Sequence, residues 1–327
     1  MLTKRQNMLE CIKGGNPDRF VKQYEAINLV MGTPVKSERP QYMKGYAVDA
    51  WGVTWNWPEG VVSAFPVHDE EHIVVKDIEH WQDYVKAPNL KFSDAEWEPF
   101  IAKIEAVDRN EQFALPFYAG GLFEMTHHLC EIQNALCYFY ENPDELHELI
   151  KYLTEYELQM AEALCHYMKP DGIFHHDDWG TKMSTFMRPD MFEEFYLDSY
   201  KQIYGYYKTH GAELIVHHCD TYAATLVPYM IEMGIDVWQG CLVTNDVPEL
   251  VKKYGGQISF MGGIASELDV EDFDPAEIEK EVVEMCEQTG PRFFIPCNTR
   301  GLPGSLFKGV YDSINDAIDV ATEKLLK

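Results

Sequence analysis

The feature that most constrains the fold is a repeated succession of a short apolar run, a polar cluster and a long amphipathic segment. The apolar runs are rich in β-branched and aromatic side chains and too short to form helices. They occupy Phe113–Ala119, Gly172–Phe174, Glu213–Val216, Asp236–Trp238, Gln257–Met261 and Arg292–Ile295. Alternation of β and α units over about 200 residues predicts a parallel sheet.

The segments between the runs carry helix-start signals, in which an N-cap residue or a proline precedes apolar residues at helical spacing. These starts are Asn142-Pro143, Pro189, Asp246 and Asp274-Pro275. The apolar runs lack an alternation of period two, as expected for strands covered on both faces. We therefore predict an α/β fold, a (β/α)8 TIM barrel forming a single domain over residues 1–327, with an open doubly wound sheet as the second choice.

The N-terminal third is less regular and is rich in aromatic residues. Five of the seven tryptophans lie between residues 50 and 100, namely Trp51, Trp55, Trp57, Trp81 and Trp97. We interpret residues 36–110 as a cap or insertion over the barrel mouth. Tryptophans are first of all packing residues, and among them Trp51 is the one we expect to face a substrate.

The charge of the chain excludes several classes of function. Lys and Arg number 27 against 54 Asp and Glu, which gives a net charge of −27. Nucleic acids and anionic membrane surfaces require clustered cations, so neither is an expected partner. No apolar run is long enough to span a membrane. The scattered cysteines contain no C-x-x-C pair and read as reduced thiols of a cytoplasmic protein. Whether it forms a homo-oligomer is left open.

Polar clusters follow directly after several of the apolar runs, where α/β barrels carry their catalytic groups. One cluster is His175-His176-Asp177-Asp178. Adjacent imidazoles and carboxylates can perturb one another's pKa and supply an acid or a base. We predict catalytic roles for His176 and Asp178 and a substrate contact for Asp177. A hydrogen-bonded loop that closes the turn is the alternative.

Two further polar clusters, which begin at His217 and at Cys297, offer a candidate zinc site. In an extended strand end, His217 and Cys219 point the same way, and together with Cys297 they would supply three ligands and leave the fourth position open. Each cysteine is otherwise explained as a small buried residue. His218 could replace His217 if the strand register differs. Asp220 would either orient a ligand or, as we prefer, cap the helix that follows.

The order and spacing of several segments across the chain resemble the uroporphyrinogen decarboxylase superfamily, and most closely its zinc-dependent, corrinoid-linked methyltransferase branch. The segments are TKRQNMLECIKGGNPDR near the start, DAWGV at 49–53, HHDDWG at 175–180, HGAELIVHHCD at 210–220, EMGIDVWQ at 232–239, ISFMGGIASE at 258–267 and IPCNTR at 295–300. The resemblance implies a (β/α)8 barrel, zinc on His217, Cys219 and Cys297, and a corrinoid (methylcobalamin) supplied by a partner protein.

The chain also departs from the family pattern. Asp220 stands where the methyltransferases have glycine, and the whole chain has only seven arginines, too few for a pocket that binds an octacarboxylate porphyrin. We therefore predict a zinc-dependent methyltransferase that moves a methyl group between a small donor or thiol acceptor and a protein-bound corrinoid. The alternatives are a decarboxylase of a smaller carboxylic acid and a non-catalytic docking module for a corrinoid-binding protein.

Overall fold

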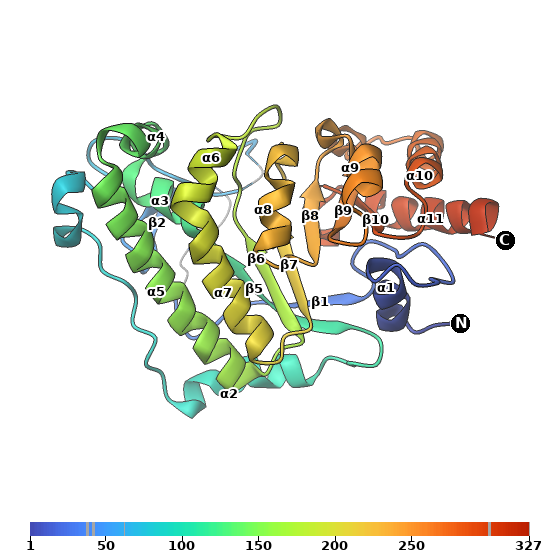
Figure 1. Cartoon of the computed structure of the whole chain (residues 1–327), viewed down its shortest axis with the longest axis horizontal. Helices are drawn as coiled ribbons and strands as arrows, with labels where there is room; N and C mark the ends of the chain where they lie inside the picture. The colour runs from blue at the N-terminus through green and yellow to red at the C-terminus, as the bar shows by residue number, and fades with distance from the viewer. Residues whose placement is uncertain (37–38, 41–42, 62, 300–301, 327) are drawn as a thin grey trace.

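A computed structural model describes residues 1–36, 39–40, 43–61, 63–299 and 302–326. Its centre is a curled sheet of parallel strands surrounded by helices (Figure 1). Along the sheet the strands are β1 (Ile27–Val30), β5 (Phe113–Ala119), β6 (Gly172–His176), β7 (Leu214–His218), β8 (Val237–Cys241), β9 (Ser259–Ile264) and β10 (Phe294–Asn298). The predicted α/β barrel fold is thus confirmed. The seven strands of this sheet include β1, which the apolar-run pattern did not predict.

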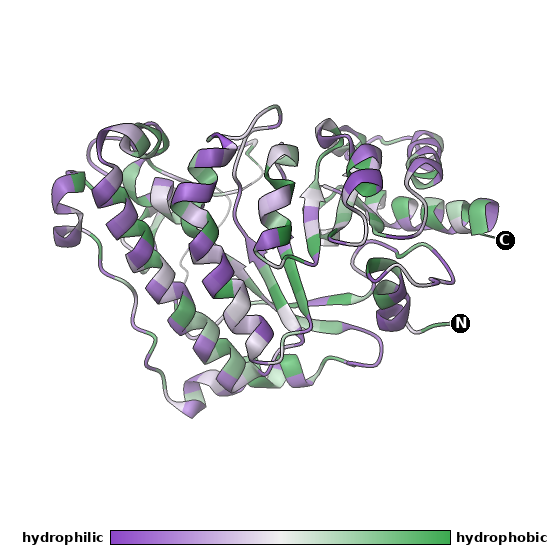
Figure 2. Ribbon diagram, viewed as in Figure 1, coloured by the Kyte–Doolittle hydropathy of each residue, from purple (hydrophilic) through white to green (hydrophobic). Residues whose placement is uncertain are grey.

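Most helices cover the outside of the sheet, whereas Met8 and Cys11 of the first helix belong to the core inside the barrel. The helices are α1 (Lys4–Ile12), α2 (Asp94–Glu105), α3 (Leu122–Cys130), α4 (Ile132–Glu141), α5 (Pro143–Met168), α6 (Pro189–Phe192), α7 (Asp198–Thr209), α8 (Val227–Glu232), α9 (Val247–Tyr254), α10 (Pro275–Thr289) and α11 (Val310–Leu326). A π-helical turn at Glu193–Leu197 joins α6 to α7. Figure 2 shows mostly hydrophobic strands inside helices that alternate between hydrophobic and hydrophilic residues, as two-sided burial of the sheet requires. Within the described residues, no helix has the apolar length that a bilayer crossing needs.

The four predicted helix starts all coincide with the first residue or N-cap of a helix, and at Asp246 and Asp274 the side chain caps the helix. Pro143 is the first residue of α5, directly after its N-cap Asn142. The side chain of Asp274 accepts a hydrogen bond from the Ala276 amide at 2.8 Å and begins α10. Because a capping side chain satisfies an amide that has no partner within the helix, these short signals fix where the helices begin and how they meet the sheet.

The barrel has an interior core of its own, separate from the core between sheet and helices. Apolar side chains from alternate strand positions fill it, among them Phe113, Leu115, Phe174, Leu214, Val216, Val237, Met261, Ile295 and Cys297. Between β1 and β10 the described residues form no strand pairing, and side-chain contacts bridge this gap. There the Gln23 Oε1 atom accepts a hydrogen bond from the Asn298 amide at 3.4 Å.

The tryptophan-rich segment includes a small antiparallel sheet that packs on α3. Its strands are β2 (Tyr46–Val48), β3 (Thr54–Asn56) and β4 (Phe65–Pro66). Trp55 donates from Nε1 to Asp49 at 2.8 Å and meets the His128 ring edge-on, with 4.9 Å between ring centroids. Trp51, our predicted substrate contact, is partly buried and packs edge-on against Tyr156 of α5, at 4.7 Å.

Candidate functional site

The polar residues that end β6 and β7 divide into two groups because side chains alternate along a strand. The two strands pair in register, so that His175 lies opposite His217 and His176 lies opposite His218. Phe174, two residues before His176, belongs to the core inside the barrel, whereas Ile173 belongs to the core under the helices. His176 and His218 therefore face the barrel axis, and His175 and His217 face the helices.

The inward-facing residues form a compact group of metal-ligand type. His176, Asp178 and His218 each offer one ligand atom, and these atoms lie within 4.8 Å of one another. Among the described residues this is the one group of three or more His, Cys, Asp or Glu side chains that meets this distance. The Nε2 atom of His176 lies 3.8 Å from the Asp178 carboxylate, and the two imidazole rings stack with centroids 4.4 Å apart.

Each of the two imidazoles is anchored through its Nδ1 atom. The His176 Nδ1 atom is 2.8 Å from Oε2 of Glu124, and the His218 Nδ1 atom hydrogen-bonds to Oε1 of Gln239. An acceptor at Nδ1 fixes the tautomer and leaves Nε2 as the nitrogen available to a ligand, which is the usual arrangement around metal-binding histidines. Asp178 is oriented in turn, since its Oδ1 accepts the Asp220 amide at 2.9 Å.

The electrostatics of the group suit a bound cation. Burial raises the pKa of Asp178 to about 6, and burial together with Asp178 raises the pKa of Asp220 to about 6 as well. Burial lowers the pKa of His176, but the carboxylates of Glu124 and Asp178 outweigh it and raise that pKa to about 10, so an ion that binds Nε2 would displace a proton from it. Burial and the nearby His176 charge lower the pKa of His218 to about 4. Crowded carboxylates that attract protons this strongly would also attract a divalent cation.

The outward-facing His217, a predicted zinc ligand, already has both ring nitrogens engaged. Its Nδ1 atom is 2.7 Å from the Tyr204 hydroxyl, and its Nε2 atom is 3.2 Å from the Asp177 carbonyl oxygen. Trp179 stacks on the ring with 4.1 Å between centroids. Burial lowers the pKa of His217 well below its usual range. These contacts are those of a packed polar residue between the sheet and α7.

The structure does not bring the three predicted zinc ligands together. Cys219 faces outward like His217, and its Sγ atom lies 2.9 Å from the Thr221 hydroxyl. Cys297 lies inside the barrel on β10, three strands from β7 along the sheet, and its Sγ donates to the Asn298 carbonyl at 3.2 Å. Burial raises the pKa of both thiols. In this structure His217, Cys219 and Cys297 therefore do not form a shared ligand group that fits a zinc ion.

Asp177, the predicted substrate contact, is a helix-capping residue inside the protein. Its side chain is fully buried. Its carboxylate accepts hydrogen bonds from the amides of Phe123 (3.0 Å) and Glu124 (2.7 Å) in the first turn of α3, and from the side chains of Trp179 (2.9 Å) and Tyr200. Gly121, the N-cap of α3, has no side chain to do this. Asp177 thereby fixes the turn that carries Glu124.

Three further residues differ from the sequence analysis. The preferred role of Asp220 as a helix cap is wrong, because the Ala223 and Ala224 amides donate to the Asn245 side chain at 2.8 and 2.9 Å. Glu124, to which the sequence pattern assigns no chemical role, anchors His176. Gln239 of β8, which anchors His218, was not singled out at all. The anchors lie on other elements than the histidines, so local sequence offered no signal for the pairing.

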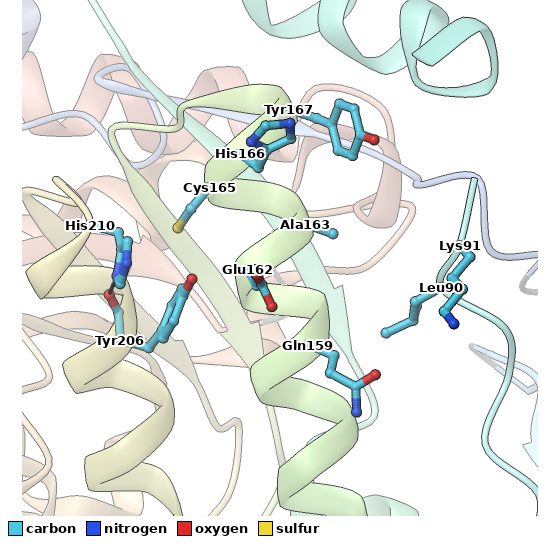
Figure 3. Close-up of a pocket in the computed structure, with 10 residues that line it drawn as sticks. All are labelled: Leu90, Lys91, Gln159, Glu162, Ala163, Cys165, His166, Tyr167, Tyr206 and His210. Atoms are coloured by element: carbon cyan, nitrogen blue, oxygen red, sulfur yellow. Dashed lines mark hydrogen bonds between the residues drawn. The ribbon is translucent and has the colours of Figure 1, made fainter. Parts of the chain in front are cut away.

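A surface groove of about 540 Å³ lies elsewhere, on the outer helical layer between α5 and α7 (Figure 3). Its lining residues are Leu90, Lys91, Gln159, Glu162, Ala163, Cys165, His166, Tyr167, Tyr206 and His210. Tyr206 and His210 stack on each other there, with 3.9 Å between ring centroids. None of these residues belongs to the His176–Asp178–His218 group, so the groove is separate from the candidate site.

Comparisons with known proteins agree with this architecture. Residues 47–300 match the family described as Uroporphyrinogen decarboxylase (URO-D). A solved structure of a methyltransferase from Methanosarcina mazei shares the fold over 100% of both chains, with a TM-score of 0.64 and 14% sequence identity. None of the curated protein sequences matches this chain significantly. Since the matched region covers most of the barrel and all the described strand ends that carry the candidate site, this chain belongs to the uroporphyrinogen decarboxylase family.

Proposed function

We propose that this chain is a methyltransferase that moves a methyl group between a small molecule and a corrinoid carried by a separate protein. The observation that carries the proposal is the His176–Asp178–His218 group, which lies at the carboxyl ends of β6 and β7. In barrels of this type those ends form the catalytic face. The fold that this chain shares with a methyltransferase also supports the proposal.

The chain's own residues would hold and orient a divalent ion at this group. His176, Asp178 and His218 would be the ligands, while Glu124 and Gln239 keep the two rings in place. Such an ion supplies Lewis acidity that polarises a heteroatom bonded to the methyl group. The proximity of these three side chains supports this ligand set, which differs from the His217, Cys219 and Cys297 set that the family resemblance implies.

Aromatic residues form an apolar wall beside the group. Phe117 lies with its ring centroid 6.4 Å from that of His176, and Phe174 stacks on His218 at 6.0 Å. The rings of Phe117 and Phe174 themselves approach to 5.7 Å. An apolar wall at a charged group lowers the local dielectric, strengthens electrostatic effects and suits a methyl group better than a carboxylate.

The test is exchange between the protein and free corrinoids. Protein loaded with Zn²⁺ would be mixed with cob(I)alamin or methylcobalamin and with candidate methyl donors and thiols, and followed by absorbance. We expect metal-dependent exchange that His218→Ala abolishes. His80→Ala changes an exposed histidine and serves as the matched control. Absence of exchange with every donor and thiol would contradict the proposal.

The same preparation tests the two alternatives. Release of CO2 from small carboxylic acids would indicate a decarboxylase, the activity for which the family is named. The crowding of Glu124, Asp178 and Asp220 speaks against such substrates, because a carboxylate would meet like charges. Capture of a corrinoid-binding protein without turnover would indicate a docking module.

A further inference from the structure

We infer that the site takes a methyl group from oxygen or nitrogen and passes it to the corrinoid, and does not methylate a thiol. This inference rests on the proposed function and adds the chemical class of substrate and the direction of transfer. It comes from the identity of the atoms that the barrel presents at the ends of β6 and β7.

The first step is that the ligand group contains no sulfur. Its described members are two imidazoles and one carboxylate. The nearest cysteine in sequence, Cys219, follows His218 by one residue and therefore points to the opposite face of β7, where Thr221 contacts its sulfur. Cys297 lies on β10 inside the barrel, and it is not among the described residues whose ligand atoms lie within 4.8 Å of one another. Neither thiol therefore belongs to the ligand group.

The second step is the effect of these ligands on an ion. Imidazole and carboxylate are harder donors than thiolate and favour oxygen or nitrogen in the remaining positions. One carboxylate cancels one of the two positive charges of a divalent ion, whereas two thiolates would cancel both. The ion at His176, Asp178 and His218 would retain more Lewis acidity than a thiolate-bound ion and would polarise an ether or amine more strongly.

The third step is the surroundings of the group. Phe117 and Phe174 supply apolar surface, and Asp220 lies beside Asp178, because its backbone amide donates to the Asp178 carboxylate at 2.9 Å. An apolar wall next to carboxylates disfavours an anionic thiolate, which would lose hydration and meet like charge. A neutral methyl ether or amine meets neither penalty.

The transfer is balanced as a displacement on carbon. The bond between the methyl carbon and its oxygen or nitrogen breaks, and both electrons stay on the heteroatom, which takes up one proton from solvent. The electron pair of a cobalt(I) corrinoid forms the new carbon–cobalt bond. The products are a demethylated alcohol, phenol or amine and a methyl-cobalt(III) corrinoid, so the corrinoid is the acceptor.

The experiment uses the full chain loaded with Co²⁺ in place of the natural ion. In the resting protein we expect visible bands of a nitrogen- and oxygen-ligated ion and no near-ultraviolet thiolate charge-transfer band. The Cys219→Ser/Cys297→Ser double variant should give the same spectrum, and Asp178→Asn should lose it. Addition of 2-methoxyphenol or trimethylamine should shift the visible bands, and the two probes separate oxygen from nitrogen donors.

Turnover then separates this inference from the proposed function. We expect cob(I)alamin to be methylated by one of the two probes, at least tenfold faster than methylcobalamin is consumed by 2-mercaptoethanol. Faster reaction with the thiol, or a thiolate band that Cys297→Ser removes, would overturn the inference and leave a corrinoid-linked methyltransferase. No reaction with any probe would overturn the proposed function itself.

Discussion

Neighbouring residues at the ends of β6 and β7 point to opposite faces of the sheet and differ in burial and in hydrogen bonding. The outward-facing His175, Asp177 and His217 are almost completely buried and hydrogen-bond to other parts of the protein. The inward-facing His176 and Asp178 keep 23% and 27% of their side-chain surface exposed. One set of polar residues holds the barrel and its helices together, and the other is left accessible to ligands.

The difference teaches that a motif read along the chain does not reveal which side of a strand carries the chemistry. Residues i and i+2 share a face, so H-x-C spacing predicts a joint ligand pair equally well on either face. A shift of one residue moves the whole set from one face to the other. In this barrel the shift exchanges His217 and Cys219 for His218 and Asp220.

The largest effect is expected at Asp177, and it tests whether the outward-facing residues stabilise the fold. Asp177→Ala should lower the free energy of unfolding by about 3 kcal/mol or more, because several buried donors lose their acceptor. Urea denaturation monitored by tryptophan fluorescence measures it. Asp177→Asn keeps an acceptor oxygen and should cost clearly less. An Asp177→Ala protein of wild-type stability would remove the distinction between the two faces.

The next largest effect is expected at His218, and it tests whether the inward-facing residues bind a metal ion. His218→Ala should weaken Zn²⁺ or Co²⁺ binding by at least about 100-fold, since it removes a direct ligand, a larger change than loss of an orienting group. Titration against a chelator of known affinity measures this. The variant His217→Asn is the matched control one residue away and should bind the ion within about threefold of the wild type. Equal losses of metal affinity in His218→Ala and His217→Asn would contradict the assignment of the ligands to the inward face.

A smaller effect is expected at the residue that joins α3 to the site. Glu124→Gln should lower metal affinity by about 10-fold, because the amide anchors the His176 Nδ1 atom more weakly than the carboxylate does. The same chelator titration measures it, with circular dichroism to confirm folding. Unchanged affinity in a folded Glu124→Gln protein would show that the anchor does not act on the ligand.

Stability should depend on pH through the outward-facing pair of Glu157 and His175, whose side chains are 2.9 Å apart. Burial raises the pKa of Glu157, and His175 opposes this only in part. A carboxyl whose folded pKa is raised contributes fully below its unfolded pKa, near 4.3, and this contribution is lost as the pH rises through the folded value. Glu157→Gln should flatten that decline in thermal melts between pH 4 and pH 8. A decline of the same slope in Glu157→Gln would assign it to other groups.

The smallest effect on metal binding is expected at the cysteines. Cys219→Ser and Cys297→Ser should each leave the affinity for Zn²⁺ within about twofold of the wild type, because both thiols lie outside the ligand group. Replacing a buried sulfur by the smaller, more polar hydroxyl should cost about 1–2 kcal/mol of stability. Isothermal titration and denaturation measure the two quantities independently, and a tenfold loss of affinity would restore a thiolate ligand.

The fold and the place of the candidate site at the strand ends could be predicted from the sequence, but the full set of residues that form the site could not. Helix starts such as Asp274 and the ends of the strands are local signals, and the clusters after Phe174 and Val216 were correctly expected to lie together at strand ends. The face of each side chain depends on where the strand ends, which periodicity fixes only to within a few residues. The anchor Glu124 pairs with His176 across 52 positions and leaves no local signal.

The central claim is that the inward-facing residues of β6 and β7 hold the ion. Anomalous diffraction at the zinc absorption edge, from crystals of the zinc-loaded protein, tests it most directly. We predict one anomalous peak within bonding distance of the His176 Nε2 atom, an Asp178 carboxylate oxygen and a His218 ring nitrogen. A peak bonded instead to the sulfur atoms of Cys219 and Cys297 would contradict the account.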